Sequence, residues 1–122
     1  MKKILFLLIF ATSLFTSCAQ DSNSIILEVA DYKEVVVGKD VQLVDVRTPQ
    51  EYKKGFIDDA INIDYMNPKS FNEEFMKLDK NKPLYIYCRS GNRSQKSVPL
   101  LKEFGFTKIY DLKDGYNAWS KQ

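Results

Sequence analysis

The chain has 122 residues, enough for one domain, and its 44% hydrophobic and 28% charged residues exclude an intrinsically disordered protein. Its formal net charge of +2 is too small to indicate a nucleic-acid partner. The sequence has no histidine and only two cysteines, which excludes His-based acid–base catalysis, His-ligated metal sites and a disulfide framework, and we expect neither a metal nor a cofactor.

Residues 1–17 have the layout of a secretory signal peptide, with two lysines near the start and an apolar run over 4–15. The run is too short to span a membrane. Its ending, FTSC, resembles the signal box of bacterial lipoproteins, which implies cleavage before Cys18 and a lipid on the thiol of that residue. The alternative is an ordinary secreted protein with a leftover cysteine.

The lipoprotein interpretation divides the chain into a signal peptide (1–17), a lipidated cysteine with a polar tether (18–24) and one folded domain (25–122). Loss of the two signal lysines leaves equal numbers of acidic and basic side chains, so the lipid, rather than a basic surface, holds the protein at a membrane. We therefore expect an exported protein anchored in the cell envelope, on the periplasmic face of a membrane or on the cell surface. Cys88 is then the one free thiol, and an unpaired cysteine in an exported protein needs an explanation.

From residue 25 onward, short apolar runs alternate with amphipathic segments. In chain order they predict a strand at 25–27, a helix at 31–37, a strand at 41–46, a helix at 49–54, a strand at 60–63, a helix at 70–78, a strand at 84–87, a helix at 95–104, a strand at 108–110 and a helix at 116–121. Thr48 is the expected cap of the second helix, and Ser70 with Glu73 resembles a capping box for the third. Pro99 predicts a kink or a late start in the fourth. This alternation predicts an α/β fold with a central parallel sheet of about five short strands and helices on both faces.

Cys88 directly follows the apolar strand at 84–87, and ligand sites in parallel sheets lie outside the carboxyl ends of the strands. The loop it opens leads into a helix, whose first amide groups favour an anion. Gly91 permits a positive φ that turns amides inward, and Arg89 and Arg93 add two permanent positive charges. Such surroundings favour a reactive thiolate without any histidine. The alternative is a buried structural cysteine beside two surface arginines.

Three motifs carry a family resemblance. The loop CRSGNRS (88–94), with LVDVRTPQEYKKGFI (43–57) before it and DLKDGYNAW (111–119) after it, resembles a single-domain rhodanese over 25–122. The resemblance implies a rhodanese-like fold and sulfur transfer, in which Cys88 is the nucleophile and takes up a sulfane sulfur as a persulfide. It also implies an anion-binding loop made of Arg89, Ser90, Gly91, Asn92 and Arg93.

The basic loop and the resemblance together indicate the partners of such a reaction. The donor is a small anion such as thiosulfate, or a persulfide on a protein, and the acceptor is a thiol, including a thiol on a protein, or cyanide. The other motif residues receive structural interpretations. Asp45 and Arg47 lie near the mouth of the site or form an ion-pair scaffold with Glu51, and we favour the scaffold. Gly115 resembles a turn residue and Trp119 a core anchor.

Two other functions fit parts of the pattern. Phosphatases and arsenate reductases also place a cysteine and an arginine around an oxyanion, but phosphatase loops keep one residue more than the four between Cys88 and Arg93. The second alternative is a non-catalytic binding module on the same fold, a role that usually follows loss of the cysteine. Because Cys88 and its loop are intact, we favour sulfur transfer.

Overall fold

The structure of the protein is a computed structural model, in which residues 24–122 are described. The predicted signal peptide, the predicted lipidation site Cys18 and all but the last residue of the predicted tether lie outside the described residues. Within 24–122, no helix is long and apolar enough to cross a membrane.

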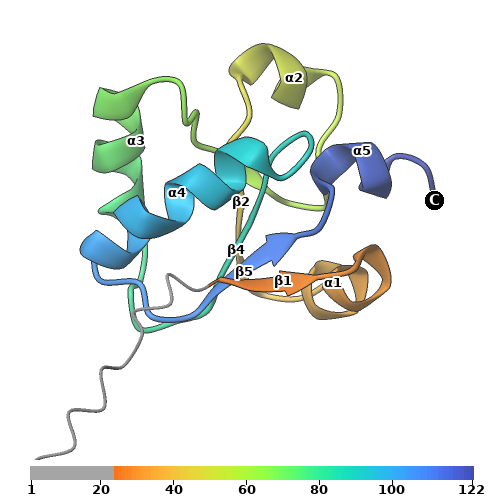
Figure 1. The fold of residues 1–122 in the computed structure, drawn as a ribbon, viewed down its shortest axis with the longest axis horizontal. Helices are drawn as coiled ribbons and strands as arrows, with labels where there is room; N and C mark the ends of the chain where they lie inside the picture. Colours follow the sequence, from red (N-terminus) through yellow and green to blue (C-terminus); the bar gives the residue numbers. More distant parts are fainter. Residues whose placement is uncertain (1–23) are drawn as a thin grey trace, which may run out of the picture.

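A single sheet of five parallel strands forms the centre of the domain (Figure 1). The strands are β1 (Ile25–Leu27), β2 (Gln42–Asp45), β3 (Ile61–Asn62), β4 (Leu84–Tyr87) and β5 (Ile109–Leu112). Their order across the sheet is β1-β5-β4-β2-β3, and every neighbouring pair is parallel. The largely buried strand β4 therefore lies in the middle, as expected for a strand that is covered on both faces.

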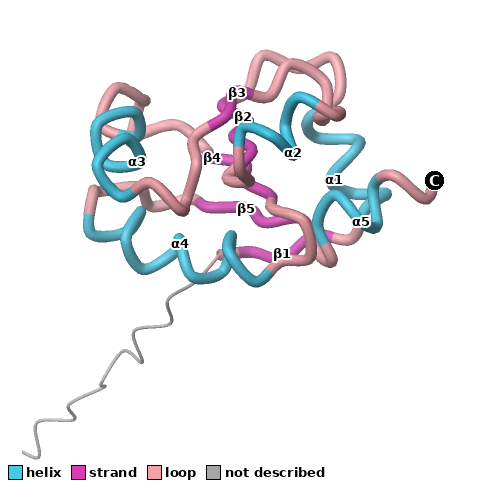
Figure 2. Tube along the Cα trace, turned by 90° about the horizontal axis from the view of Figure 1, so that it is seen from above, coloured by secondary structure: helices cyan, strands magenta, loops and turns pink. Residues whose placement is uncertain are grey.

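Helices cover both faces of this sheet (Figure 2). They are α1 (Val29–Val36), α2 (Pro49–Lys53), α3 (Pro68–Phe75), α4 (Asn92–Glu103) and α5 (Gly115–Trp119). One hydrophobic cluster joins the sheet to α3 and α4, and a second cluster on the opposite face joins it to α1 and α5. The short helix α2 buries none of its residues. The α/β fold with a central parallel sheet, predicted from the alternation of strands and helices, is confirmed.

Four helices begin earlier than the sequence predicts: α1 and α3 by two residues, α4 by three and α5 by one. Helix α4 begins at Asn92, three residues earlier than expected, because Gly91 adopts a left-handed conformation (φ 100°) and its carbonyl accepts a hydrogen bond from the Gln95 amide at 3.0 Å. The helix continues through Pro99, so the expected late start is wrong. The early start places the first turn of α4 directly against the cysteine loop.

Helix α3 begins at Pro68, and the side chain of Asn67 caps it by accepting a hydrogen bond from the Ser70 amide at 3.3 Å. The predicted capping box of Ser70 and Glu73 is therefore wrong. The pattern was misread because Pro at the first helical position, preceded by Asn, is itself a strong start signal and lies two residues earlier. The predicted cap at Thr48 is confirmed at the start of α2, where Thr48 and Glu51 together form a capping box.

Candidate active site

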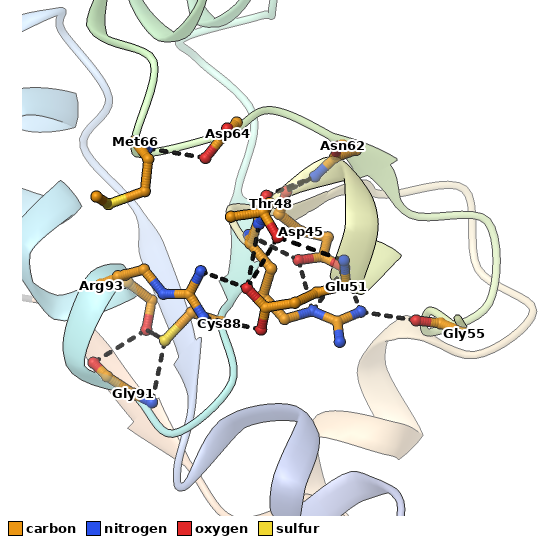
Figure 3. Close-up of polar contacts among 12 residues, drawn as sticks. Asp45, Thr48, Glu51, Gly55, Asn62, Asp64, Met66, Cys88, Gly91 and Arg93 are labelled. Atoms are coloured by element: carbon orange, nitrogen blue, oxygen red, sulfur yellow. Dashed lines mark hydrogen bonds and ion pairs between the residues drawn. The ribbon is translucent and has the colours of Figure 1, made fainter. Parts of the chain in front are cut away.

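Cys88 occupies the first position after β4, at the carboxyl edge of the sheet, and is 1% exposed. The left-handed conformation of Gly91 turns the backbone so that its amide donates to Sγ of Cys88 at 3.0 Å. The hydroxyl oxygen of Ser94, in the first turn of α4, lies 3.3 Å from the same sulfur. The sulfur thus has two close polar neighbours: the Gly91 amide, which Figure 3 shows beside it, and the Ser94 hydroxyl.

The start of α5 holds the cysteine loop in place. The amides of Tyr116 and Asn117 donate to the carbonyls of Cys88 (2.8 Å) and Arg89 (2.9 Å). These bonds require a very close approach at Gly115, where an added Cβ would lie 2.7 Å from the carbonyl carbon and oxygen of Arg89 and closer still to the carbonyl oxygen of Cys88. The φ of 56° at Gly115 agrees with the turn residue expected there, and its contact with the cysteine loop is an additional role.

Arg93 lies beside Cys88 and reaches across to α2, where it forms a two-pronged ion pair with Glu51 (Figure 3). Its Nη1 and Nη2 donate to the two carboxylate oxygens at 2.7 and 3.0 Å. The hydrogen bond to Glu51 raises the pKa of Arg93, and the nearby charge of Cys88 raises it further. In turn, the hydrogen bond from the guanidinium lowers the pKa of Glu51 to about 2. The Arg93 guanidinium is therefore a permanent cation beside the sulfur. It is already paired with the Glu51 carboxylate, and an incoming anion must compete with that carboxylate for the guanidinium.

The remaining loop residues are oriented differently from the expectation of two guanidinium groups around the sulfur. The side chains of Arg89, Ser90 and Asn92 are exposed. Within 24–122, the Arg89 side chain forms no hydrogen bond or ion pair. The residue contacts α5 through its backbone carbonyl, which accepts the Asn117 amide. The structure thus brings Cys88, Gly91 and Arg93 together and leaves the other members of the predicted anion-binding loop at the surface.

The scaffold interpretation of Asp45 and Arg47 agrees with the structure. Both residues are buried, and Arg47 Nη2 donates to Asp45 Oδ2 at 2.6 Å and to the Gly55 carbonyl at 2.7 Å. The guanidinium also lies 4.1 Å from the ring centre of Tyr116, which follows the loop-holding glycine. The predicted third member, Glu51, is instead bonded to Arg93. The scaffold therefore consists of Asp45 and Arg47 without Glu51, and it supports α5 through the contact of Arg47 with Tyr116.

Sequence reasoning missed one buried charged group near the sulfur. Asp111, on β5, is 1% exposed and accepts hydrogen bonds at Oδ2 from Ser94 (2.9 Å) and from Gln95 of α4. Burial raises the pKa of its carboxyl to about 6, although the hydrogen bonds from Gln95, Ser94 and the Leu112 backbone act in the opposite direction. The signal was present in the sequence, because a charged residue between apolar positions of a buried parallel strand needs a partner.

The raised pKa of Asp111 predicts a pH dependence of folding stability. The folded state favours the neutral carboxyl, so this contribution is complete below the ordinary aspartate pKa of 3.8 and is lost as the pH rises through the raised pKa of about 6. The shift corresponds to roughly 3 kcal/mol. Urea unfolding between pH 4 and 7 should therefore show the wild type losing about that free energy of unfolding relative to Asp111→Asn. The exposed-residue control Asp31→Asn should run parallel to the wild type, and a parallel Asp111→Asn curve would contradict the assignment.

These features define a parallel α/β domain with a cysteine loop at the carboxyl edge of its central strand, closed by an arginine of the following helix. The family model for the rhodanese-like domain matches residues 28–122. The chain belongs to the rhodanese-like family.

Known relatives carry the same assignment at the level of the family. A sulfurtransferase of Allochromatium vinosum is 34% identical over 102 residues, which cover 83% of this chain and 86% of the relative. The thiosulfate sulfurtransferase GlpE of Shewanella oneidensis is 33% identical over 93 residues, 76% of this chain and 89% of the relative. The crystal structure of a rhodanese-related protein from Thermoplasma volcanium superposes with a TM-score of 0.68 at 30% identity, covering 80% of this chain and 91% of that one.

Proposed function

We propose that the protein is a rhodanese-type sulfurtransferase in which Cys88 carries the transferred sulfur. The observation that carries the proposal is the placement of Sγ: it accepts the Gly91 amide at 3.0 Å, in a loop closed by Arg93, at the carboxyl edge of a rhodanese-like sheet. An amide donor and a neighbouring cation stabilise a sulfur anion. The sulfurtransferase names of the relatives support the same chemistry.

The proposed reaction has two displacement steps. The Cys88 thiolate attacks the outer sulfur of thiosulfate, the sulfur–sulfur bond of the donor breaks, and sulfite leaves with the electron pair. The outer sulfur of the resulting persulfide is then attacked by a thiolate or cyanide, and Cys88 leaves as a thiolate. The Gly91 amide stabilises the sulfur anion before the first step and after the second, and Arg93 attracts the anionic donor.

The nearly complete burial of Cys88 favours a donor that presents its sulfur on a narrow group. Thiosulfate meets this requirement, and so does a protein persulfide, whose outer sulfur stands at the end of a cysteine side chain. The test is a donor and acceptor screen with purified protein: thiosulfate with cyanide, and thiosulfate with a small thiol, with thiocyanate or sulfite release as the readout. Donor-dependent release supports the enzyme. Absence of release with every pair would leave the non-catalytic binding module.

We also propose that the domain is held at a membrane of the cell envelope by a lipid on Cys18. Support comes from the signal-like residues 1–17 and the FTSC ending, which carry the cysteine close to the start of the folded domain. Metabolic labelling with a fatty acid in a bacterial host should mark the wild type and not Cys18→Ala. The labelling of both, or of neither, would contradict the anchor. The matched control Cys88→Ala should be labelled like the wild type.

A further inference from the structure

A continuous chain of three side-chain groups leads from the reactive sulfur into the core. Sγ of Cys88 lies 3.3 Å from Oγ of Ser94, and that hydroxyl lies 2.9 Å from Oδ2 of Asp111. All three residues are buried. Cys88 directly follows β4, Asp111 lies on the adjacent strand β5, and Ser94 bridges them from the first turn of α4.

The Ser94 hydroxyl has only one proton with which to form hydrogen bonds to its neighbours in this chain. The Gly91 amide is a donor to the sulfur, so it cannot receive a proton from the thiol. Within 24–122, Oγ of Ser94 is the one acceptor within hydrogen-bond distance of Sγ. That hydroxyl has a single proton to share among three neighbours: the Cys88 sulfur, the Gly91 carbonyl (3.1 Å) and the Asp111 carboxylate. It therefore cannot stabilise a thiolate and an ionised Asp111 at the same time.

We propose that Cys88, Ser94 and Asp111 act as one acid–base unit, in which Asp111 takes up the proton that Cys88 releases. The inference rests on the proposed function in that it explains how a buried nucleophile becomes a thiolate. Asp111 is a positioning residue here, because it acts on the sulfur through Ser94 and touches no substrate.

The proton transfer balances as follows. The S–H bond of Cys88 breaks and its electron pair stays on sulfur, while the proton passes to Oγ of Ser94. The proton originally on Ser94 passes to Oδ2 of Asp111, which becomes a neutral carboxylic acid. The serine hydroxyl ends neutral, with its new proton directed at the thiolate. One negative charge is thereby moved from the carboxylate to the sulfur, and the buried region does not have to hold a second one for the thiolate to form.

The carboxyl group is suited to this exchange. Burial brings the pKa of Asp111 to about 6, close to neutral pH, so the group can accept and release a proton under ordinary conditions. Its other oxygen, Oδ1, is buried and has no well-formed hydrogen bond within the described part of the chain. Asp111 also contributes to the lining of a cavity of about 240 Å³, together with Ser90, Gln95 and Lys113. This cavity gives the proton an exit to water behind the loop.

Other titratable groups surround the unit on each packed element. Tyr32 of α1 feels the charge of Asp111, and burial raises its pKa well above the usual value. From α4, Arg93 acts on Cys88 and is paired with Glu51 of α2, whose pKa is lowered to about 2. The chain after β5 adds Lys113 and Asp114, which line the cavity. Tyr32, Arg93 and Glu51 keep one charge state between pH 5 and 9, so a change of state near pH 6 points to Asp111 itself.

The test is the pH dependence of alkylation at Cys88 by iodoacetamide, followed on the Cys88 peptide by mass spectrometry so that Cys18 does not interfere. In the full-length wild type, we expect two steps, the lower one near pH 6 where the unit shares a single charge. In Asp111→Asn the lower step should disappear, and the main step should move to lower pH by about one unit because the competing anion is gone. Identical profiles in the two proteins would overturn the proposal.

A second variant tests the bridge. Ser94→Ala should also remove the lower step, but its main step should move to higher pH, because the thiolate loses a hydrogen-bond donor and Asp111 stays charged. The matched control is Ser97→Ala, which removes a buried serine hydroxyl one turn further along α4 and should retain both steps. If Ser94→Ala keeps the lower step, the sulfur and the carboxyl are not linked through the serine and the proposal is wrong.

Alkylation requires no sulfur donor, so this experiment separates the inference from the proposed function. Two-step alkylation in a protein that transfers no sulfur would retain the acid–base unit and overturn the enzyme. Donor-dependent sulfur transfer with a single, unchanged alkylation step would retain the enzyme and overturn the unit.

Discussion

Cys88→Ser should abolish sulfur transfer, with a loss of at least about a thousandfold in kcat/KM for thiosulfate. The hydroxyl that replaces the thiol is a poor nucleophile at neutral pH and cannot form a persulfide, because the reaction needs a sulfur that attacks and later leaves as a stable anion. The substitution is nearly the same size, and the Gly91 amide and the Ser94 hydroxyl remain available as hydrogen-bond partners. The fold should therefore survive, as circular dichroism and urea unfolding would show.

The matched control is Cys18→Ala, which removes the only other cysteine of the chain. Its turnover should equal that of the wild type. Residual transfer in Cys88→Ser that disappears when Cys18 is replaced as well would place the sulfur on the wrong residue, and undiminished transfer in Cys88→Ser would exclude Cys88 as the required sulfur carrier.

Gly115→Ala should be among the most damaging substitutions in the domain, with a loss of about 4 kcal/mol in the free energy of unfolding. The added Cβ would meet backbone atoms of Cys88 and Arg89 at distances that real Cβ atoms do not show, the carbonyl carbon and oxygen of Arg89 at 2.7 Å among them. Backbone cannot move aside as a flexible side chain does. Relief requires α5 to withdraw, which breaks the bonds from its first amides to the loop. Sulfur transfer should fall together with stability.

Gly38→Ala separates this clash from the cost of the backbone conformation. Gly38 has a similar left-handed φ of 69°, but an added Cβ there meets nothing within 4 Å. Its alanine variant should lose only roughly 1–2 kcal/mol, the usual cost of placing a side chain in that conformation. Equal losses in the two variants, measured by urea unfolding, would show that the close approach at the loop has no energetic weight.

The elements that were predicted correctly owe their structure to local signals. The strand before Cys88 is an apolar run that ends where the side chains turn polar, and its four residues match the prediction. Thr48 followed by Pro49 specifies the start of α2 by capping and by a fixed φ, both of which act within one turn. The position of Cys88 at the carboxyl edge follows from the parallel sheet that such alternation produces.

The parts of the site that were not predicted depend on contacts between distant segments. The partner of Arg93 is Glu51, 42 positions earlier. The sequence does not show whether Glu51 pairs with Arg47 or with Arg93, because that depends on how the helix that carries Glu51 is placed relative to α4. Asp111 meets Ser94 only because β5 lies beside β4 in the sheet. The early start of α4 follows from the φ of Gly91, which glycine permits without specifying.

The measurement that tests the central claim most directly is the mass of the protein after incubation with thiosulfate and removal of excess donor. If Cys88 is the sulfur carrier, the wild type gains the mass of one sulfur atom, the gain maps to the Cys88 peptide, and addition of cyanide or a thiol removes it. A wild-type protein that stays unmodified under conditions in which a known thiosulfate sulfurtransferase is loaded, or a gain that maps elsewhere, would contradict the account.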